Sequence, residues 1–225
     1  MNEPHSALAH LGCAICVLIA ALSGSVATHF PGFQQWTLEH YFIMPLVFLA
    51  LLTAAWLLEH ALTTGAILLL LGASAICGGL VLGGFSLVGP SLVCQMTAGP
   101  LCYFAAAALV LHRWSGKLYR WQLCCIFTLA GILGAALVSG LTAESPVSTI
   151  CALLLTCTVA TFELIVFFSK GYFEITSESR TRSTVLAILM LQALPVYKTL
   201  WYFFITSRHG VYGAGRFIFN WFRWM

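Results

Sequence analysis

The sequence predicts an all-α integral membrane protein, folded as a seven-transmembrane helix bundle. Hydrophobic residues make up 60% of the 225 residues and charged residues only 8%, whereas soluble domains carry roughly 25% charged residues. The apolar residues fall into seven long runs joined by short polar connections. Each run is close to the ~20 residues that a helix needs to cross the hydrocarbon. Seven such runs use most of the chain, so we expect a single transmembrane domain.

Each run is expected to be a helix, because a spanning helix satisfies its backbone hydrogen bonds within its own segment. The predicted spans are 7–28, 41–62, 65–88, 92–111, 118–140, 147–169 and 183–206. The boundary between the second and third spans is the least marked, since Thr63-Thr64-Gly65 is barely polar. No Lys or Arg precedes the first run, which favours a first span over a cleavable signal peptide.

Residues 207–225 form a tail that mixes arginine with aromatic side chains. Two interpretations of this tail stay open. It can anchor the last helix as an aromatic belt at the membrane interface, or it can lie along the membrane surface as an interfacial segment.

Positive charge gathers in two connections that a seven-span chain places on one side of the membrane. They carry Arg113, Lys117 and Arg120, and Lys170, Arg180 and Arg182. Basic loops favour the cytosolic side, so we expect a cytosolic N-terminus. The three arginines of the tail argue against this assignment. The net charge of +3 is small and spread thinly, which predicts no nucleic-acid partner.

Two predicted spans carry small residues four positions apart, which places them on one helix face. Gly79 and Gly83 lie in the third span, and Gly131 and Ala135 lie in the fifth. Small residues let helix backbones approach closely in a membrane. These four residues are therefore predicted to form helix-packing faces.

The cysteines predict little chemistry. Cys13 and Cys16 have the spacing of a redox or zinc pair, but they lie in an apolar run without a second ligand pair, which favours a packed helix face. Cys124 and Cys125, near the cytosolic start of the fifth span, are candidates for palmitoylation. The alternative is that they are small buried side chains. The chain contains no Asp and no catalytic triad, so we expect no enzyme activity, no cofactor and no metal site.

Three polar residues at membrane depth are the candidate functional residues: Glu163, Gln192 and Lys198. With a rise of ~1.5 Å per residue, Glu163 lies roughly 10 Å and Gln192 roughly 15 Å from the cytosolic edge. The two can therefore meet across neighbouring antiparallel helices as a gate or pH sensor. Lys198 lies deeper and is expected to snorkel outward. Alternatively, Glu163 reaches the cytosolic interface and Gln192 bonds a backbone carbonyl.

The last third of the chain resembles the transmembrane Bax-inhibitor-motif (TMBIM) family. The resemblance is carried by Phe162-Glu163-Leu164-Ile165, by the loop Phe173-Glu174-Ile175-Thr176-Ser177-Glu178, and by Gln192 where the family has a second acid. It implies seven spans and a cytosolic N-terminus. It also implies a calcium leak closed by a proton-sensitive pair, of which only Glu163 is an acid here. The departures resemble the divergent seven-span members of cytomegaloviruses.

Two functions follow as expectations. The first is an ion-leak protein of the endoplasmic reticulum, the Golgi or another endomembrane, with calcium ions as its partner, that modulates calcium and cell death. The second is a non-conducting adaptor, viral in the cytomegalovirus interpretation, that alters the trafficking of host membrane proteins in immune evasion. Retention of Glu163 favours the leak, and loss of the second acid favours the adaptor. Both require the lipid bilayer as a partner.

Overall fold

The computed structural model describes residues 3–40, 43–58, 61, 63–84, 90–114 and 119–142, and residues 149–161 without 151, 155 and 158. Its ordered elements are six α-helices within these ranges, and residues 149–161 are helical where they are described. The helices are α1 (Glu3–Ala27), α2 (Pro31–Glu39), α3 (Ile43–Leu57), α4 (Thr64–Gly84), α5 (Pro90–Trp114) and α6 (Arg120–Thr142).

Four of these helices are long and apolar enough to cross a membrane. Their apolar stretches are His10–Ala27, Gly65–Gly84, Val93–Arg113 and Trp121–Thr142, and they fall in the first, third, fourth and fifth predicted spans. The second predicted span contains α3, whose apolar stretch Leu46–Ala55 is shorter. The sixth is described only at 149–161. The seventh span and the tail lie outside the described residues, so the seven-span count remains a prediction.

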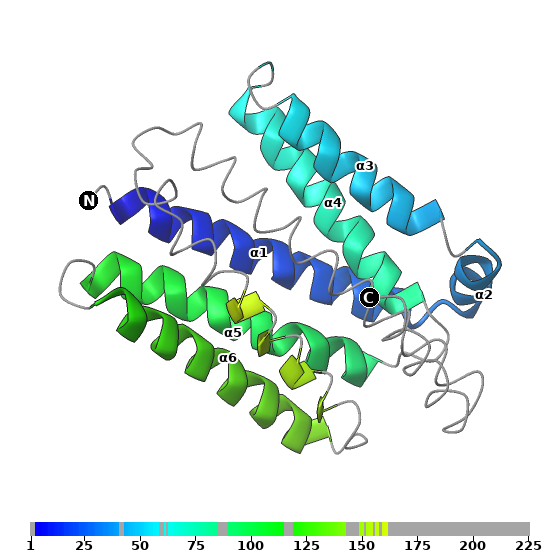
Figure 1. Ribbon diagram of the computed structural model, residues 1–225. Coiled ribbons are helices and arrows are strands. Elements are labelled where there is room, and N and C mark those ends of the chain that lie inside the picture. Colours follow the sequence, from blue (N-terminus) through cyan, green and yellow to red (C-terminus); the bar gives the residue numbers. More distant parts are fainter. Residues whose placement is uncertain are drawn as a thin grey trace, which may run out of the picture.

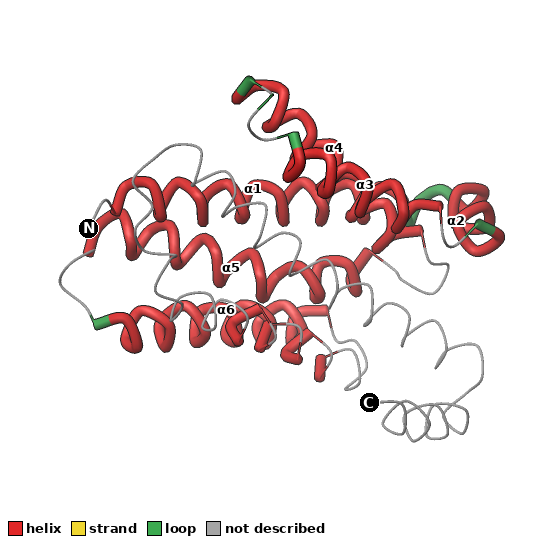
Figure 2. The backbone as a smooth tube through the Cα atoms, turned by 45° about the horizontal axis from the view of Figure 1, so that its top comes forward, coloured by secondary structure: helices red, strands yellow, loops and turns green. Residues whose placement is uncertain are grey.

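The long helices lie side by side in the order α3, α4, α1, α5, α6 (Figure 1). The first helix in the chain therefore lies in the middle of the row, between α4 and α5. Helices that follow each other along the chain from α3 to α6 run in opposite directions, whereas α1 and α4 run in the same direction (Figures 1 and 2). The start of α1, the end of α5 and the start of α6 share one end of the row, and α2 lies at the other.

The outer surface of the row is apolar, as expected for a protein surrounded by lipid rather than water. One face of α1 exposes a stripe with helical spacing: Leu8, Leu11, Ile15, Leu18, Leu22 and Val26. A second stripe follows α6: Leu129, Leu133, Leu137 and Leu141. An exposed apolar surface of this extent is rare on soluble monomers. Its presence supports a multi-pass membrane protein in contact with the bilayer.

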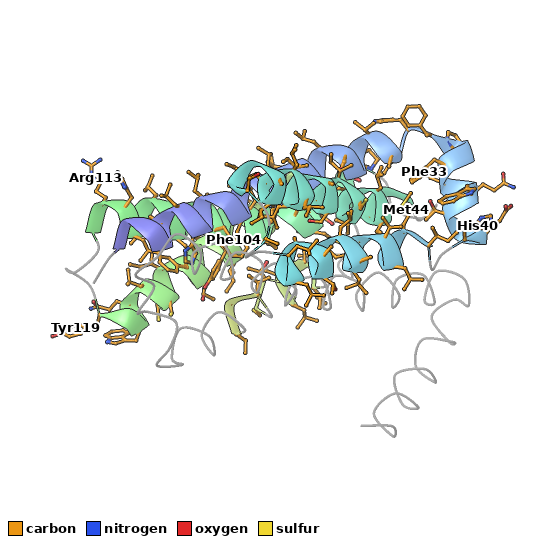
Figure 3. All side chains as sticks on the ribbon, turned by 90° about the horizontal axis from the view of Figure 1, so that it is seen from above. Phe33, His40, Met44, Phe104, Arg113 and Tyr119 are labelled. Carbon is orange, nitrogen blue, oxygen red and sulfur yellow. The ribbon has the colours of Figure 1, made fainter. Side chains whose placement is uncertain are left out.

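Helix α2 was not predicted from the sequence. Its nine residues are too few to span a membrane, and it lies across the end of the row (Figure 3). The Gln34 Nε2 group donates to the carbonyl oxygen of Thr28, just after α1, at 3.4 Å. It also donates to the carbonyl oxygen of Gly83, at the end of α4, at 3.5 Å. The ring of Trp36 stacks on the ring of His40 with centroids 5.1 Å apart. Helix α2 thus ties together the ends of two parallel helices.

Candidate functional site: buried polar groups between apolar helices

Glycine brings α1 and α4 into close contact. A Cβ added at Gly79 would meet the Ser23 hydroxyl and the Ala20 carbonyl, and one added at Gly83 would meet the Gly24 carbonyl. The Ser23 hydroxyl donates to its own helix at Ile19 O, 2.9 Å away. Gly79 and Gly83 therefore lie where two backbones touch, and their missing side chains make that approach sterically feasible.

Small residues also set the contact between α5 and α6. A Cβ added at Gly99 would lie 3.3 Å from the Ala135 Cβ, and one added at Gly131 would lie 3.3 Å from the Tyr103 Cβ. The contact residue four positions later in α5 therefore meets the contact residue four positions earlier in α6, as expected for two antiparallel helices. Residues 149–161 pack onto the same junction, because Thr156 lies against both Gly99 and Gly131.

A buried aromatic centre joins α1, α5 and α6. His10 is fully buried, and its ring centroid lies 6.2 Å from that of Phe104 and 6.3 Å from that of Phe127. Tyr103 packs edge-on against both phenylalanine rings, at 5.4 and 5.9 Å. Figure 3 shows Phe104 inside the row of helices. This arrangement places an imidazole, which can carry a proton, inside the apolar helices.

A second buried polar group joins α5 and α6 near the end of the row where α6 stops. Gln95 is fully buried, and its Nε2 donates to Thr142 Oγ1 at 2.9 Å. The Thr142 hydroxyl is within 2.9 Å of the Val138 carbonyl, to which it donates. Ser139, one turn from Thr142, is also buried. Interhelical hydrogen bonds of this type stabilise helix pairs in membranes by about 1 kcal/mol.

The cysteines Cys13, Cys16, Cys124 and Cys125 are not joined in disulfides, and their surroundings differ. Cys13, Cys16 and Cys124 are buried, whereas Cys125 is exposed. Of the two palmitoylation candidates, only Cys125 therefore presents its sulfur at the surface. Within the described ranges, no group of three or more His, Cys, Asp or Glu side chains is placed to hold a metal ion.

The residues that the sequence put forward as a gate, Glu163 and Gln192, lie outside the described residues, as does Lys198. His10 and Gln95 were not identified from the sequence. The signal that identifies them is the one applied to Glu163: a polar residue within an apolar run long enough to span. Both were overlooked because they lie near the ends of their runs, where interfacial side chains are common.

Comparison of the chain with protein-family models, curated proteins and solved structures found no match. The class defined by the fold and the buried groups is a helical multi-pass membrane protein with polar side chains inside its helix row.

Proposed function

We propose that this protein leaks ions across an internal membrane, in the manner of the TMBIM calcium-leak proteins that its last third resembles. The observation that carries the proposal is the full burial of His10 and Gln95 between helices that are long and apolar enough to cross a membrane. Polar and ionisable groups buried among membrane helices are costly and mark ion paths and proton relays, and these two lie near the ends of their apolar stretches. The protein would act in the endoplasmic reticulum, the Golgi or another endomembrane, with its N-terminus in the cytosol, and would modulate calcium and cell death.

The gate in this proposal is the pair Glu163 and Gln192, from the sixth and seventh predicted spans. A glutamine amide both donates and accepts hydrogen bonds, so it can bond an ionised carboxylate and a protonated one. The pair would therefore stay closed over a wider pH range than two acids, which repel each other when both are ionised. We therefore expect a calcium leak that depends only weakly on pH near neutrality. The carboxyl group of Glu163 is the source of this pH dependence.

Purified full-length protein in calcium-loaded liposomes tests this function. Calcium release is recorded over a pH series from acid to neutral for the wild type, for Glu163→Gln and for a matched variant, Glu174→Gln, in the predicted loop. We expect release by the wild type, a flat pH profile for Glu163→Gln and an unchanged profile for Glu174→Gln. A folded wild-type protein that releases no calcium would rule out the leak. An unchanged profile for Glu163→Gln would remove that residue from the gate.

A second candidate function is a non-conducting adaptor that binds host membrane proteins. Its support is the apolar stripe from Leu8 to Val26, which α1 exposes although it is the middle helix of the row. Lipid gives no hydrophobic drive for helix association, so a partner helix would be held by close packing along this stripe. A photo-activatable side chain at Ile15 tests the stripe in cell membranes, with Leu133 on the α6 stripe as the matched control. The adaptor predicts a discrete protein adduct at Ile15 alone, together with no calcium release from liposomes. Adducts with lipid only would contradict it.

A further inference from the structure

Within the part of the chain that the structure describes, two buried side-chain oxygens between α5 and α6 have no hydrogen-bond partner. They are Oε1 of Gln95 and Oγ of Ser139. Gln95 is 0% exposed and Ser139 is 7% exposed. The other half of the Gln95 amide is occupied, since its Nε2 donates to Thr142 Oγ1. Buried polar atoms in proteins are hydrogen-bonded with few exceptions, so both oxygens point to a ligand.

The helix register brings these two residues face to face. Gly99 opposes Ala135, and Tyr103 opposes Gly131. One helical turn closer to the start of α5 and to the end of α6, Gln95 opposes Ser139. The hydrogen bond from Gln95 to Thr142, one turn beyond Ser139, agrees with this register. The register therefore places the two unpartnered oxygens on facing turns of α5 and α6, within the buried contact of the two helices.

The chemistry of the site selects a neutral donor. The carbonyl oxygen of Gln95 only accepts hydrogen bonds, and the Ser139 oxygen can accept as well. Gln95 lies in the second turn of α5 and Ser139 in the last turn of α6, so opposite ends of two helix dipoles meet there and largely cancel. The acids among the described residues, Glu3 and Glu39, belong to α1 and α2. A buried cation would thus have no described counter-charge, and an unpaired buried charge is expensive.

We propose that Gln95 and Ser139 bind one water molecule between α5 and α6, which donates a hydrogen bond to Gln95 Oε1 and forms a second one with the Ser139 hydroxyl, a group that can both donate and accept. Gln95 lies two residues, about 3 Å, inside the start of its apolar stretch, and Ser139 lies three residues, about 4.5 Å, inside the end of its own, so the water can be supplied from the membrane surface. The bound water links the two helices through hydrogen bonds and so helps to fix their register. This site does not depend on the leak and would exist in an adaptor too.

Solution NMR of the full-length protein in nanodiscs tests the site. The chain has five glutamines, so selective ¹⁵N-glutamine labelling gives few side-chain amide signals, and Gln95→Leu identifies the Gln95 pair by its loss. We expect a nuclear Overhauser cross-peak between water and the Gln95 amide protons, with the sign of a long-lived water. Ser139→Ala should abolish it, and Ser139→Cys, which keeps the volume, should weaken it. The matched control is Ser74→Ala, because the Ser74 hydroxyl is buried elsewhere and donates to the Leu71 carbonyl, 2.8 Å away.

Three outcomes would overturn the proposal. The first is a Gln95 amide without a water cross-peak. The second is a cross-peak that persists unchanged in Ser139→Ala, because the water would then be held by other groups. The third is a Gln95 resonance that shifts when sodium replaces choline in the buffer, which would identify a cation as the occupant.

Discussion

At the scale of single residues, the absence of a side chain matters as much as its presence. Gly79 lets the α4 backbone touch α1, while Gly72, two turns earlier on the same helix, has open space where a Cβ would stand. The two glycines share a helix but have opposite consequences for packing. The sequence predicted that Gly79 and Gly83 form a packing face. It did not predict which helix they meet, because spacing defines a face and carries no information about its neighbour.

This contrast yields a prediction for one methyl group. Gly79→Ala should destabilise the protein by about 1–3 kcal/mol, because the new Cβ forces α1 and α4 apart. Gly72→Ala should stabilise it by up to about 1 kcal/mol, since alanine is the better helix former and nothing obstructs it. Unfolding in mixed micelles, followed by circular dichroism, measures both. Equal effects at the two positions would show that the α1–α4 contact is looser than described.

At the scale of helices, apolar runs predicted α1, α4, α5 and α6 because length and hydropathy are the properties that a bilayer selects. They did not predict α2, whose segment Pro31–Glu39 contains two glutamines and a glutamate and is too short to span. Its helix depends on tertiary contacts: Thr37 is buried against Gly84, and Gln34 bonds the ends of α1 and α4. No local pattern reports such contacts. The polar character of His10 and Gln95 is visible in the sequence, but their full burial is not, because burial is a property of neighbouring helices.

The role of α2 can be tested with two adjacent glutamines. Gln34→Ala should destabilise the protein by about 0.5–1.5 kcal/mol, because removal of the Gln34 amide takes a donor away from two helix-end carbonyls. Gln35→Ala is the control, since the exposed Gln35 amide bonds Glu39 on the next turn of its own helix, and changes of exposed residues usually stay within about 0.5 kcal/mol. Unfolding in the same micelles gives both values. Similar values for the two variants would mean that Gln34 does not hold α2 in place.

At the scale of the whole molecule, the row of helices has two distinct ends. Arg113 and Tyr119 lie at one end, and Phe33 and His40 lie at the other (Figure 3). Basic residues on the first end favour a cytosolic position for it. If these antiparallel helices span the membrane, the two ends of the row face different compartments. This sidedness can be measured without knowing the function.

We predict that Gly116 and Gly171 face the cytosol and that Gly32 faces the opposite side. Single cysteines at these positions, in a cysteine-free background, are labelled with an impermeant reagent in sealed and in permeabilised membranes. Gly32 suits this test because it is exposed and a Cβ there meets nothing. Labelling of Gly116 and Gly171 from different sides would contradict the seven-span count. Labelling of Gly32 and Gly116 from the same side would contradict the described row.

The central position of α1 has a consequence for biosynthesis. Helix α1 leaves the ribosome before both of its neighbours, α4 and α5, which are completed only at Gly84 and Trp114. During synthesis of the intervening segment, α1 must therefore remain in the bilayer or beside the insertion machinery without its final partners. The free-energy cost of leaving α1 without these partners is small, because lipid solvates the leucines of its apolar stripe as well as a protein neighbour does. We therefore expect α1 to acquire its two final neighbours only after α5 has been inserted.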